Sequence, residues 1–210
     1  MNGITDKLVE RYMDDLLPRR DDVLTEIEAT AARRDIPIIG PAVARVLYQY
    51  AQLINARRIY EMGSAIGYST IWLARAVGSN GKVYYTDGSA ANAAEARGYF
   101  ERAEVADRIE ILVGDSMALL DSVDGEFDLI FNDVDKHQYP EAFHKAVPRL
   151  RRGGLFITDN ALWYGKVARD DADKYTAGVR EFNQLIYAAD DLYPTILPIR
   201  DGLAVCLRLK

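Results

Sequence analysis

The 210-residue sequence is poor in cysteine and histidine, and it contains no long hydrophobic run. With the single cysteine Cys206, no disulfide can form within the chain, and neither His137 nor His144 has a Cys or His partner at zinc-ligand spacing. No apolar stretch approaches the ~20 residues of a membrane helix, and the first residues lack the apolar core of a signal peptide. The net charge of -6 argues against a broad basic surface for nucleic acid. We therefore expect a cytoplasmic enzyme or binding protein.

The G-x-G-x-x-G motif of dinucleotide-binding proteins is also missing. In its place stands a short apolar run, Ile59–Met62, followed by Gly63 and Gly67 and by a predicted helix that begins at Tyr68. A strand that turns through glycines into a helix leaves backbone N–H groups free to bind a carboxylate or a phosphate. The spacing is weak evidence by itself, since such a turn also occurs without a ligand.

From residue 58 onward, segments typical of strands alternate with segments typical of helices. This alternation predicts an α/β fold with a mostly parallel sheet covered on both faces. We expect one domain, 1–210, with an N-terminal helical extension (1–57) and a Rossmann-like core (58–210). The predicted helices are Thr5–Leu17, Asp21–Arg34, Pro41–Asn55, Tyr68–Val77, Ser89–Ala103, Ser116–Leu120, Tyr139–Leu150 and Asp173–Ala189. The predicted strands are Arg58–Met62, Lys82–Thr86, Ile109–Val113, Phe127–Asn132, Gly154–Asp159, Tyr193–Ile199 and Leu203–Leu209.

The last two predicted strands are joined by Arg200–Gly202, and an Asp-Gly pair between apolar runs indicates a hairpin. A closing antiparallel hairpin differs from the plain dinucleotide-binding fold. It is common in methyltransferases that use S-adenosylmethionine, so the sheet is predicted to have seven strands of the class I methyltransferase kind.

Ligands of open α/β sheets bind beyond the carboxyl ends of the strands. Ser69 stands at the start of the helix after the glycine turn, where its hydroxyl binds a ligand carboxylate or caps the helix. Asp87 follows the second strand about 20 residues past the glycines, where a ribose diol is bound, or else it caps the next helix. Asp115 after the third strand is placed either to accept from an adenine amino group or to cap a short helix, as is Ser116, and the two alternatives are equally supported.

Asp133 follows the fourth strand, and Asp159 and Asn160 follow the fifth. Three oxygen-bearing side chains at neighbouring strand ends suit a hard cation, Mg²⁺ first, with Ca²⁺ or Mn²⁺ as alternatives. Lys136 lies three residues beyond Asp133. Near a cation its ammonium form is disfavoured, so it can act as a base; otherwise it is a surface lysine paired with Asp135.

Several motifs in order make the chain resemble the cation-dependent O-methyltransferases of the catechol and caffeoyl-coenzyme A type, with their bacterial relatives. The resemblance runs from about the third predicted helix to the C-terminus. The motifs are Glu61–Thr70, Val105–Ile109, Gly114–Ser116, Asp128–Lys136, Asp159–Val167 and Leu197–Gly202.

The resemblance implies roles for individual residues. Asp133, Asp159 and Asn160 match the metal ligands, and Lys136 matches the lysine that deprotonates the acceptor hydroxyl. Asp87 stands where the family usually has a ribose-binding glutamate. The full set assigned to the S-adenosylmethionine site is Glu61, Gly63, Ser64, Gly67, Ser69, Asp87, Gly114, Asp115, Ser116 and Asp133.

The predicted function is O-methylation of a small hydroxylated, catechol-like or phenolic acceptor, with S-adenosylmethionine as donor and a divalent cation. The alternatives are a tRNA hydroxyuridine methyltransferase, which the acidic balance disfavours, an NAD-dependent dehydrogenase, which the missing glycine motif disfavours, and a protein that senses the cofactor without turnover. Trp163 and Tyr164 either wall an aromatic acceptor or pack their own loop. No membrane partner is expected. Proteins of the family often form dimers, so the resemblance implies a homodimer.

Overall fold

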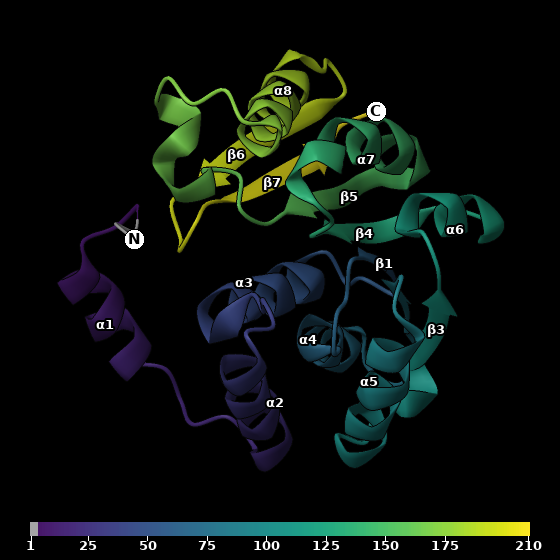
Figure 1. Cartoon of the computed structure of the whole chain (residues 1–210). Helices are drawn as coiled ribbons and strands as arrows, with labels where there is room; N and C mark the ends of the chain where they lie inside the picture. Colours follow the sequence, from purple (N-terminus) through teal and green to yellow (C-terminus); the bar gives the residue numbers. More distant parts are fainter. Residues whose placement is uncertain (1–3) are drawn as a thin grey trace.

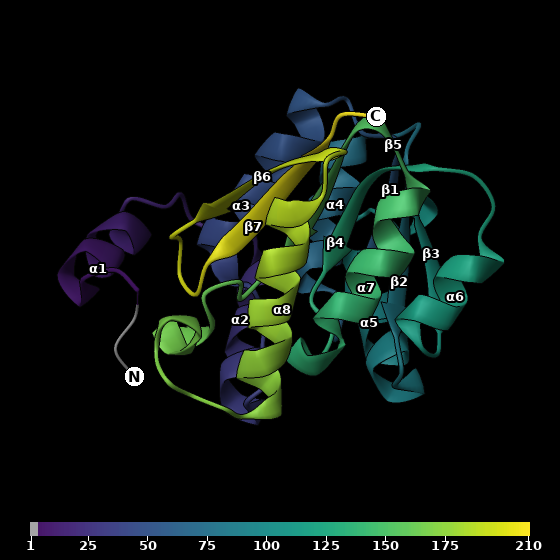
Figure 2. The same cartoon turned by 90° about the horizontal axis from the view of Figure 1, so that it is seen from above.

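The computed structural model describes residues 4–210, in which one sheet of seven strands lies between two layers of helices (Figures 1 and 2). The strand order is β3-β2-β1-β4-β5-β7-β6. The first five strands along the chain are parallel, whereas β7 runs antiparallel to both β5 and β6. The predicted mixed sheet with its C-terminal hairpin is therefore confirmed. The strands are β1 (Arg58–Met62), β2 (Lys82–Asp87), β3 (Ile109–Val113), β4 (Phe127–Asn132), β5 (Leu150–Thr158), β6 (Leu192–Leu197) and β7 (Leu203–Arg208).

The helices cover both faces of the sheet. Helices α2 to α5 lie on one face and α6 to α8 on the other (Figure 1), and each layer buries its own apolar cluster against the strands. The α-helices are α1 (Lys7–Asp15), α2 (Asp22–Arg34), α3 (Gly40–Leu53), α4 (Tyr68–Val77), α5 (Ala90–Arg102), α6 (Ser116–Ser122), α7 (Tyr139–Ala146) and α8 (Lys174–Ala188). Short 3₁₀ helices are η1 (Ala106–Arg108), η2 (Lys136–Gln138), η3 (Val147–Arg149) and η4 (Trp163–Ala168).

The boundary between α7 and β5 differs from the prediction. A helix was expected over Tyr139–Leu150, but α7 ends at Ala146, and η3 leads directly into β5 at Leu150. Pro148 explains the early end, because it cannot donate the helical hydrogen bond and its ring clashes with the preceding turn. Strand β5 therefore begins four residues earlier than expected.

The register of the central strands brings the predicted site together. Met62 of β1 is paired with Asn132 of β4, and Asn132 is paired with Thr158 of β5. The pairing continues past the strands, since Asp133 N donates to Met62 O at 2.8 Å and Asp159 N donates to Asn132 O at 3.1 Å. The two aspartates thus leave the sheet side by side, next to the glycine bend.

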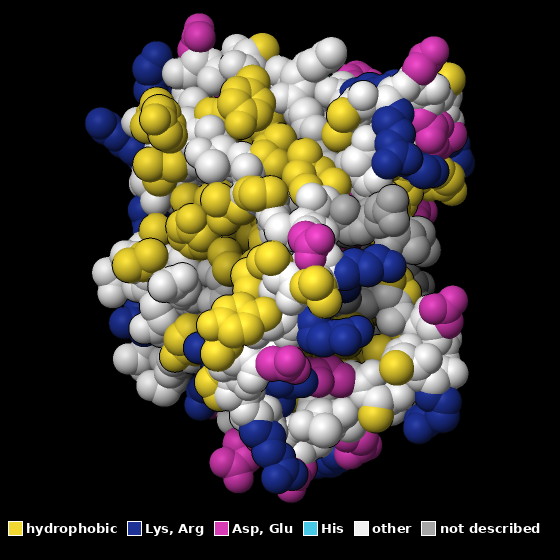
Figure 3. Space-filling view, turned by 90° about the vertical axis from the view of Figure 1, so that its left-hand side faces the viewer, with side chains coloured by type: hydrophobic (Ala, Val, Ile, Leu, Met, Phe, Trp, Pro, Cys, Tyr) yellow, Lys and Arg dark blue, Asp and Glu magenta, His cyan; other side chains and the backbone are white. Residues whose placement is uncertain are grey.

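Helix α1 lies apart from the two helical layers (Figure 1). Asp6 caps its N-terminus by accepting from Leu8 N at 2.8 Å, and none of its nine residues is buried. Apolar side chains gather in a broad patch on the side of the molecule where α1 lies (Figure 3). Of the helices in the described part of the chain, none is both long and apolar enough to cross a membrane.

Candidate active site

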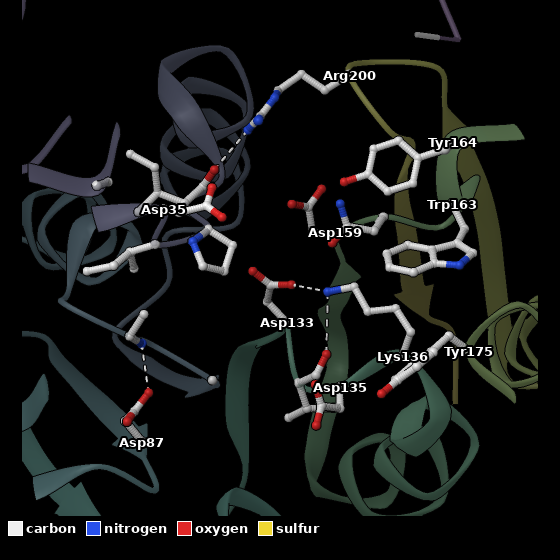
Figure 4. A pocket seen from close by; sticks show the side chains of 18 of the residues that line it. Asp35, Asp87, Asp133, Asp135, Lys136, Asp159, Trp163, Tyr164, Tyr175 and Arg200 are labelled. Carbon is white, nitrogen blue, oxygen red and sulfur yellow. Dashed lines mark hydrogen bonds and ion pairs between the residues drawn. The ribbon is translucent and has the colours of Figure 1, made fainter. Parts of the chain in front are cut away.

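A cavity of about 860 Å³ lies at the carboxyl ends of the central strands. Figure 4 shows Asp133, Lys136 and Asp159 facing one another near its centre, with Asp87 on one side and Trp163 and Tyr164 on the other. Six of the predicted site residues line it, namely Gly63, Asp87, Asp133, Lys136, Asp159 and Asn160. The central constellation predicted from the strand ends is therefore assembled in one place.

The two aspartates form a pair of largely buried carboxylates. Asp159 is 5% exposed, and the side chain of Asp133 is 19% exposed. Burial raises the pKa of Asp133, and the cations Lys136 and Arg200 offset this only in part. Burial, followed by repulsion from Asp133, raises the pKa of Asp159 to about 7. Two buried carboxylates side by side repel each other when both are ionised. A cation bound between them would offset this repulsion and their desolvation cost.

The chemistry of this donor set fits a hard cation. Asp133 and Asp159 offer carboxylate oxygens, and Asn160 adds an amide whose Nδ2 lies 3.5 Å from Asp201 Oδ2. With its nitrogen directed to Asp201, the amide has its oxygen available as a ligand. Within residues 4–210 no group of three or more His, Cys, Asp or Glu side chains is placed to hold a metal ion. The candidate set therefore depends on the amide as its third ligand.

Lys136 is paired with Asp133 and not with Asp135. Its Nζ donates to Asp133 Oδ1 at 2.8 Å, and its side chain is 15% exposed. The ammonium group also lies 5.5 Å from the ring centre of Tyr139 and 5.9 Å from that of Trp163. The alternative of a surface lysine paired with Asp135 is therefore wrong, and Nζ stands where it can exchange a proton with a ligand in the cavity.

The glycine bend approaches the acid pair closely. Gly63 has φ +84°, and a Cβ at this position would stand 2.6 Å from the backbone oxygen of Asp133. Any side chain at residue 63 would push the β1 and β4 ends apart. Glycine is therefore required here to keep the bend and the aspartates in one cavity.

Asp87 braces the opposite side of the bend. Its Oδ2 accepts from Ala65 N at 3.0 Å, and its Oδ1 accepts from Ser89 N at 2.8 Å and from Asn92 Nδ2 at 3.1 Å. The N-cap of α5 is Ser89, whose hydroxyl accepts from Asn92 N. Asp87 thus orders the backbone around the cavity, and its role toward a ribose stays a prediction.

The other predicted cofactor residues do not line this cavity. Asp115 shows the capping alternative, because its Oδ1 accepts from Met117 N and Ala118 N at the start of α6. Ser116 Oγ accepts from Thr86 Oγ1 at 2.8 Å, beneath the strand ends. The residues that do not line the cavity are Glu61, Ser64, Gly67, Ser69, Gly114, Asp115 and Ser116.

Residues with a left-handed backbone are concentrated in the cavity wall, and some of them were not assigned from sequence patterns. Of the eight non-glycine residues with positive φ in residues 4–210, six line this cavity: Asp35, Ala65, Asn160, Trp163, Tyr164 and Arg200. Such conformations cost about 1–3 kcal/mol each and cluster at functional sites. Asp35, Tyr175 and Arg200 come from loops or helix ends far apart in the chain, so no periodic pattern identifies them. Trp163 and Tyr164 line the cavity, as the wall alternative requires.

Comparison with known proteins gives a consistent result. A family model described as "O-methyltransferase" matches residues 19–209. The catechol O-methyltransferase of Niastella koreensis is 33% identical over 219 residues, covering 99% of each chain. The caffeoyl-CoA O-methyltransferase 1 of Eucalyptus globulus is 29% identical, covering 98% of this chain and 90% of that one. The crystal structure of an O-methyltransferase from Bacillus cereus in complex with SAH matches with a TM-score of 0.87 and 32% identity, covering 96% of this chain and 97% of that chain.

The match extends over nearly the whole chain, including the strand ends that carry Asp133 and Asp159. It confirms the predicted fold class and the predicted enzyme class, an S-adenosylmethionine-dependent O-methyltransferase. The sequence motifs, the mixed sheet and the relatives agree, and the chain belongs to the O-methyltransferase family.

Proposed function

We propose that the protein methylates one hydroxyl of a small catechol-like acceptor, with S-adenosylmethionine as methyl donor and a divalent cation, most suitably Mg²⁺. The observation that supports this most is the buried pair Asp133 and Asp159 with Lys136 Nζ at 2.8 Å from Asp133 Oδ1. The names of the relatives, catechol and caffeoyl-CoA O-methyltransferases, support the acceptor class.

The cation would be held by Asp133, Asp159 and the amide oxygen of Asn160. A bound Mg²⁺ supplies a charge that favours the ionised form of an acceptor hydroxyl. Two adjacent hydroxyls can chelate such an ion, which favours a catechol over a lone phenol. Trp163 and Tyr164 provide aromatic surface beside this position.

Lys136 is the proposed proton acceptor. Asp133 holds its amine at the centre of the cavity, and the rings of Tyr139 and Trp163 restrict its movement. In the neutral form, Nζ takes the proton of the acceptor hydroxyl. Asp87 and the backbone at Gly63 line the side of the cavity where the donor's ribose and methionine parts would lie. A donor and an acceptor bound in this way would have acceptor oxygen, methyl carbon and sulfur held in line by the cavity wall, which would make the transfer effectively unimolecular.

A methyl-transfer screen tests the proposal. We expect turnover of catechol that EDTA abolishes and Mg²⁺ restores, and weaker or no turnover of caffeoyl-CoA and tRNA. Asp133→Ala combined with Asp159→Ala should lower kcat/KM by about two orders of magnitude or more, because the charge stabilisation at the reacting oxygen is lost.

The double variant Asp107→Ala plus Asp190→Ala, at exposed positions outside the cavity, is the matched control and should keep full activity. Methylation of catechol that persists in EDTA and in the Asp133/Asp159 double variant would contradict the role of the metal. Methylation of tRNA in preference to catechol would support the alternative acceptor.

We also propose that the protein is a homodimer. The basis is the apolar side of α1, on which Leu8, Tyr12 and Leu16 are 74%, 64% and 64% exposed. Apolar surface of this extent on one short helix is unfavourable in water unless a partner covers it.

A further inference from the structure

A second cavity of about 710 Å³ adjoins the first. It lies between α1, the start of α3 and the turn between β6 and β7, and its wall includes Met13, Leu17 and Pro41. The two cavities share four wall residues, Asp159, Asn160, Tyr164 and Arg200. Two of the three candidate metal ligands, Asp159 and Asn160, therefore stand at the boundary between the two cavities.

Arg200 lies at this boundary, and its side chain between the two cavities is called the bar. Its side chain extends from the β6–β7 turn, beside the first cavity, to the segment that precedes α3 (Figure 4). Nη1 donates to the carbonyl oxygen of Ile38 at 3.1 Å and also to that of Ile39. Charge-assisted hydrogen bonds to two successive carbonyls fix the guanidinium at its far end.

The guanidinium of Arg200 lies against Gly40, where there is no side chain. A Cβ at Gly40, which has φ +68°, would stand 2.9 Å from Arg200 Nη1. Ile39 beside it is buried and anchors the two carbonyls to the core. A side chain at residue 40 would therefore displace the Arg200 guanidinium from this position.

On the basis of the proposed function, we infer that Arg200 is a specificity-determining residue that confines the acceptor to a compact single ring. With the bar in place, a catechol bound at Asp133 and Asp159 cannot extend a bulky substituent into the second cavity. Without the bar, the two cavities become continuous, and an acceptor with a second ring fits.

The local charges favour a steric role over recognition of an anionic acceptor. Nη1 of Arg200 is already bonded to two carbonyls. The second cavity carries the acids Glu10 and Asp14, and its Arg20 is paired with Glu28 at 2.8 Å. An acceptor with a carboxylate tail would meet acids as well as arginines there, so size is the property that the bar controls.

The test compares the binding of three probes by calorimetry in the presence of S-adenosylhomocysteine and Mg²⁺, which permits no turnover. The probes are catechol, caffeate as a charged single-ring acceptor, and phenethyl caffeate as a neutral two-ring acceptor. Arg200→Ala should raise the affinity for phenethyl caffeate relative to catechol about tenfold, a typical size discrimination by a pocket wall. Its affinity for caffeate relative to catechol should not change.

Gly40→Ala displaces the Arg200 guanidinium and should also raise the affinity for phenethyl caffeate relative to catechol. Arg97→Ala, at an exposed position on α5 outside both cavities, should leave it unchanged, and thermal melting checks that each variant is folded. If neither Arg200→Ala nor Gly40→Ala gains relative affinity for phenethyl caffeate, the bar is refuted. A selective loss of caffeate binding would also overturn it, because it would show carboxylate recognition. Methylation of catechol by the wild type is assayed separately, so failure of the proposed function and failure of the bar are distinguished.

Discussion

At the scale of single residues, Glu61 is a carboxylic acid with no exposed surface. Thr70 Oγ1 donates to its Oε2, whereas Oε1 has no hydrogen-bond partner among residues 4–210. Burial raises its pKa to about 7, although the hydroxyls of Ser69, Thr70 and Ser64 counteract part of the increase. Glu61 was predicted to bind the cofactor, but in this structure it lies beneath the glycine bend and not in the cavity wall.

The proton on Glu61 makes stability depend on pH. Between pH 4.5, the ordinary value of such a group, and about 7, the folded chain holds the proton that the unfolded chain has released. Stability therefore falls as the pH rises through this interval. Relative to Glu61→Gln, the wild type should lose about 3 kcal/mol of unfolding free energy from about pH 4.5 to about pH 8, measured by urea denaturation.

Thr70→Val is the companion variant. It removes the hydroxyl that stabilises the ionised form, so its loss of stability should continue to higher pH than in the wild type. A difference between wild type and Glu61→Gln that stays constant across the range would show that Glu61 does not carry this proton.

Some site residues could be predicted from the sequence alone, and others could not. Asp133, Lys136 and Asp159 were predictable because strand ends of a parallel sheet meet at one edge. The role of Asp115 could not be predicted, because a ligand-binding carboxylate and a helix-capping carboxylate stand at the same place at the start of a helix. The structure shows that Asp115 caps α6. For Arg200 the sequence showed only its place in a motif. Its hydrogen bonds to Ile38 and Ile39 could not be predicted, because they join residues more than 160 positions apart.

At the scale of elements, α4 and α5 pack together through a glycine. Gly67, at the N-cap of α4, has φ +85°, and a Cβ there would lie 2.4 Å from the ring of Phe100 on α5. Gly67 was predicted to bind the cofactor, and the structure gives it this packing role as well. Gly67→Ala should lower the free energy of unfolding by about 2–4 kcal/mol, from the left-handed backbone and the overpacked ring together.

Gly98→Ala on α5 is the matched control. No atom lies within 4 Å of a Cβ at Gly98, so the change should stabilise the helix by about 0.5–1 kcal/mol. Denaturant unfolding measures both variants. Equal effects of the two substitutions would show that the contact with Phe100 does not limit the packing of the two helices.

Element types followed from the sequence pattern, whereas element ends were predicted less well, as Pro148 at the end of α7 shows. Strands β1, β3 and β4 begin and end as predicted, because short apolar runs bounded by polar or turn residues define them. The early start of β5 was missed, because the preceding helix was predicted to extend to Leu150 and the strand to begin at Gly154. In the structure the sheet already continues through residues 150–153, with an irregular register against β4. Pairing with a neighbouring strand is a long-range property that local pattern does not contain.

At the scale of the whole molecule, the apolar side of α1 faces away from the fold. Leu8, Tyr12 and Leu16 repeat every four residues along the helix and are all exposed, whereas Met13 and Leu17 face the second cavity. A helix in water keeps such a stripe only at a cost, and a second copy of the chain can cover it through a two-fold symmetric contact.

The proposed dimer is therefore sensitive to charge on α1. Leu8→Glu combined with Leu16→Glu should shift the protein to a monomer in sedimentation velocity, because two buried carboxylates would oppose their copies across the interface. Ala91→Glu plus Ala94→Glu, at exposed positions of α5, adds the same charge elsewhere and should leave the dimer intact. A wild type that sediments as a monomer at every concentration tested would refute the dimer, and the stripe on α1 would then be free for a different partner.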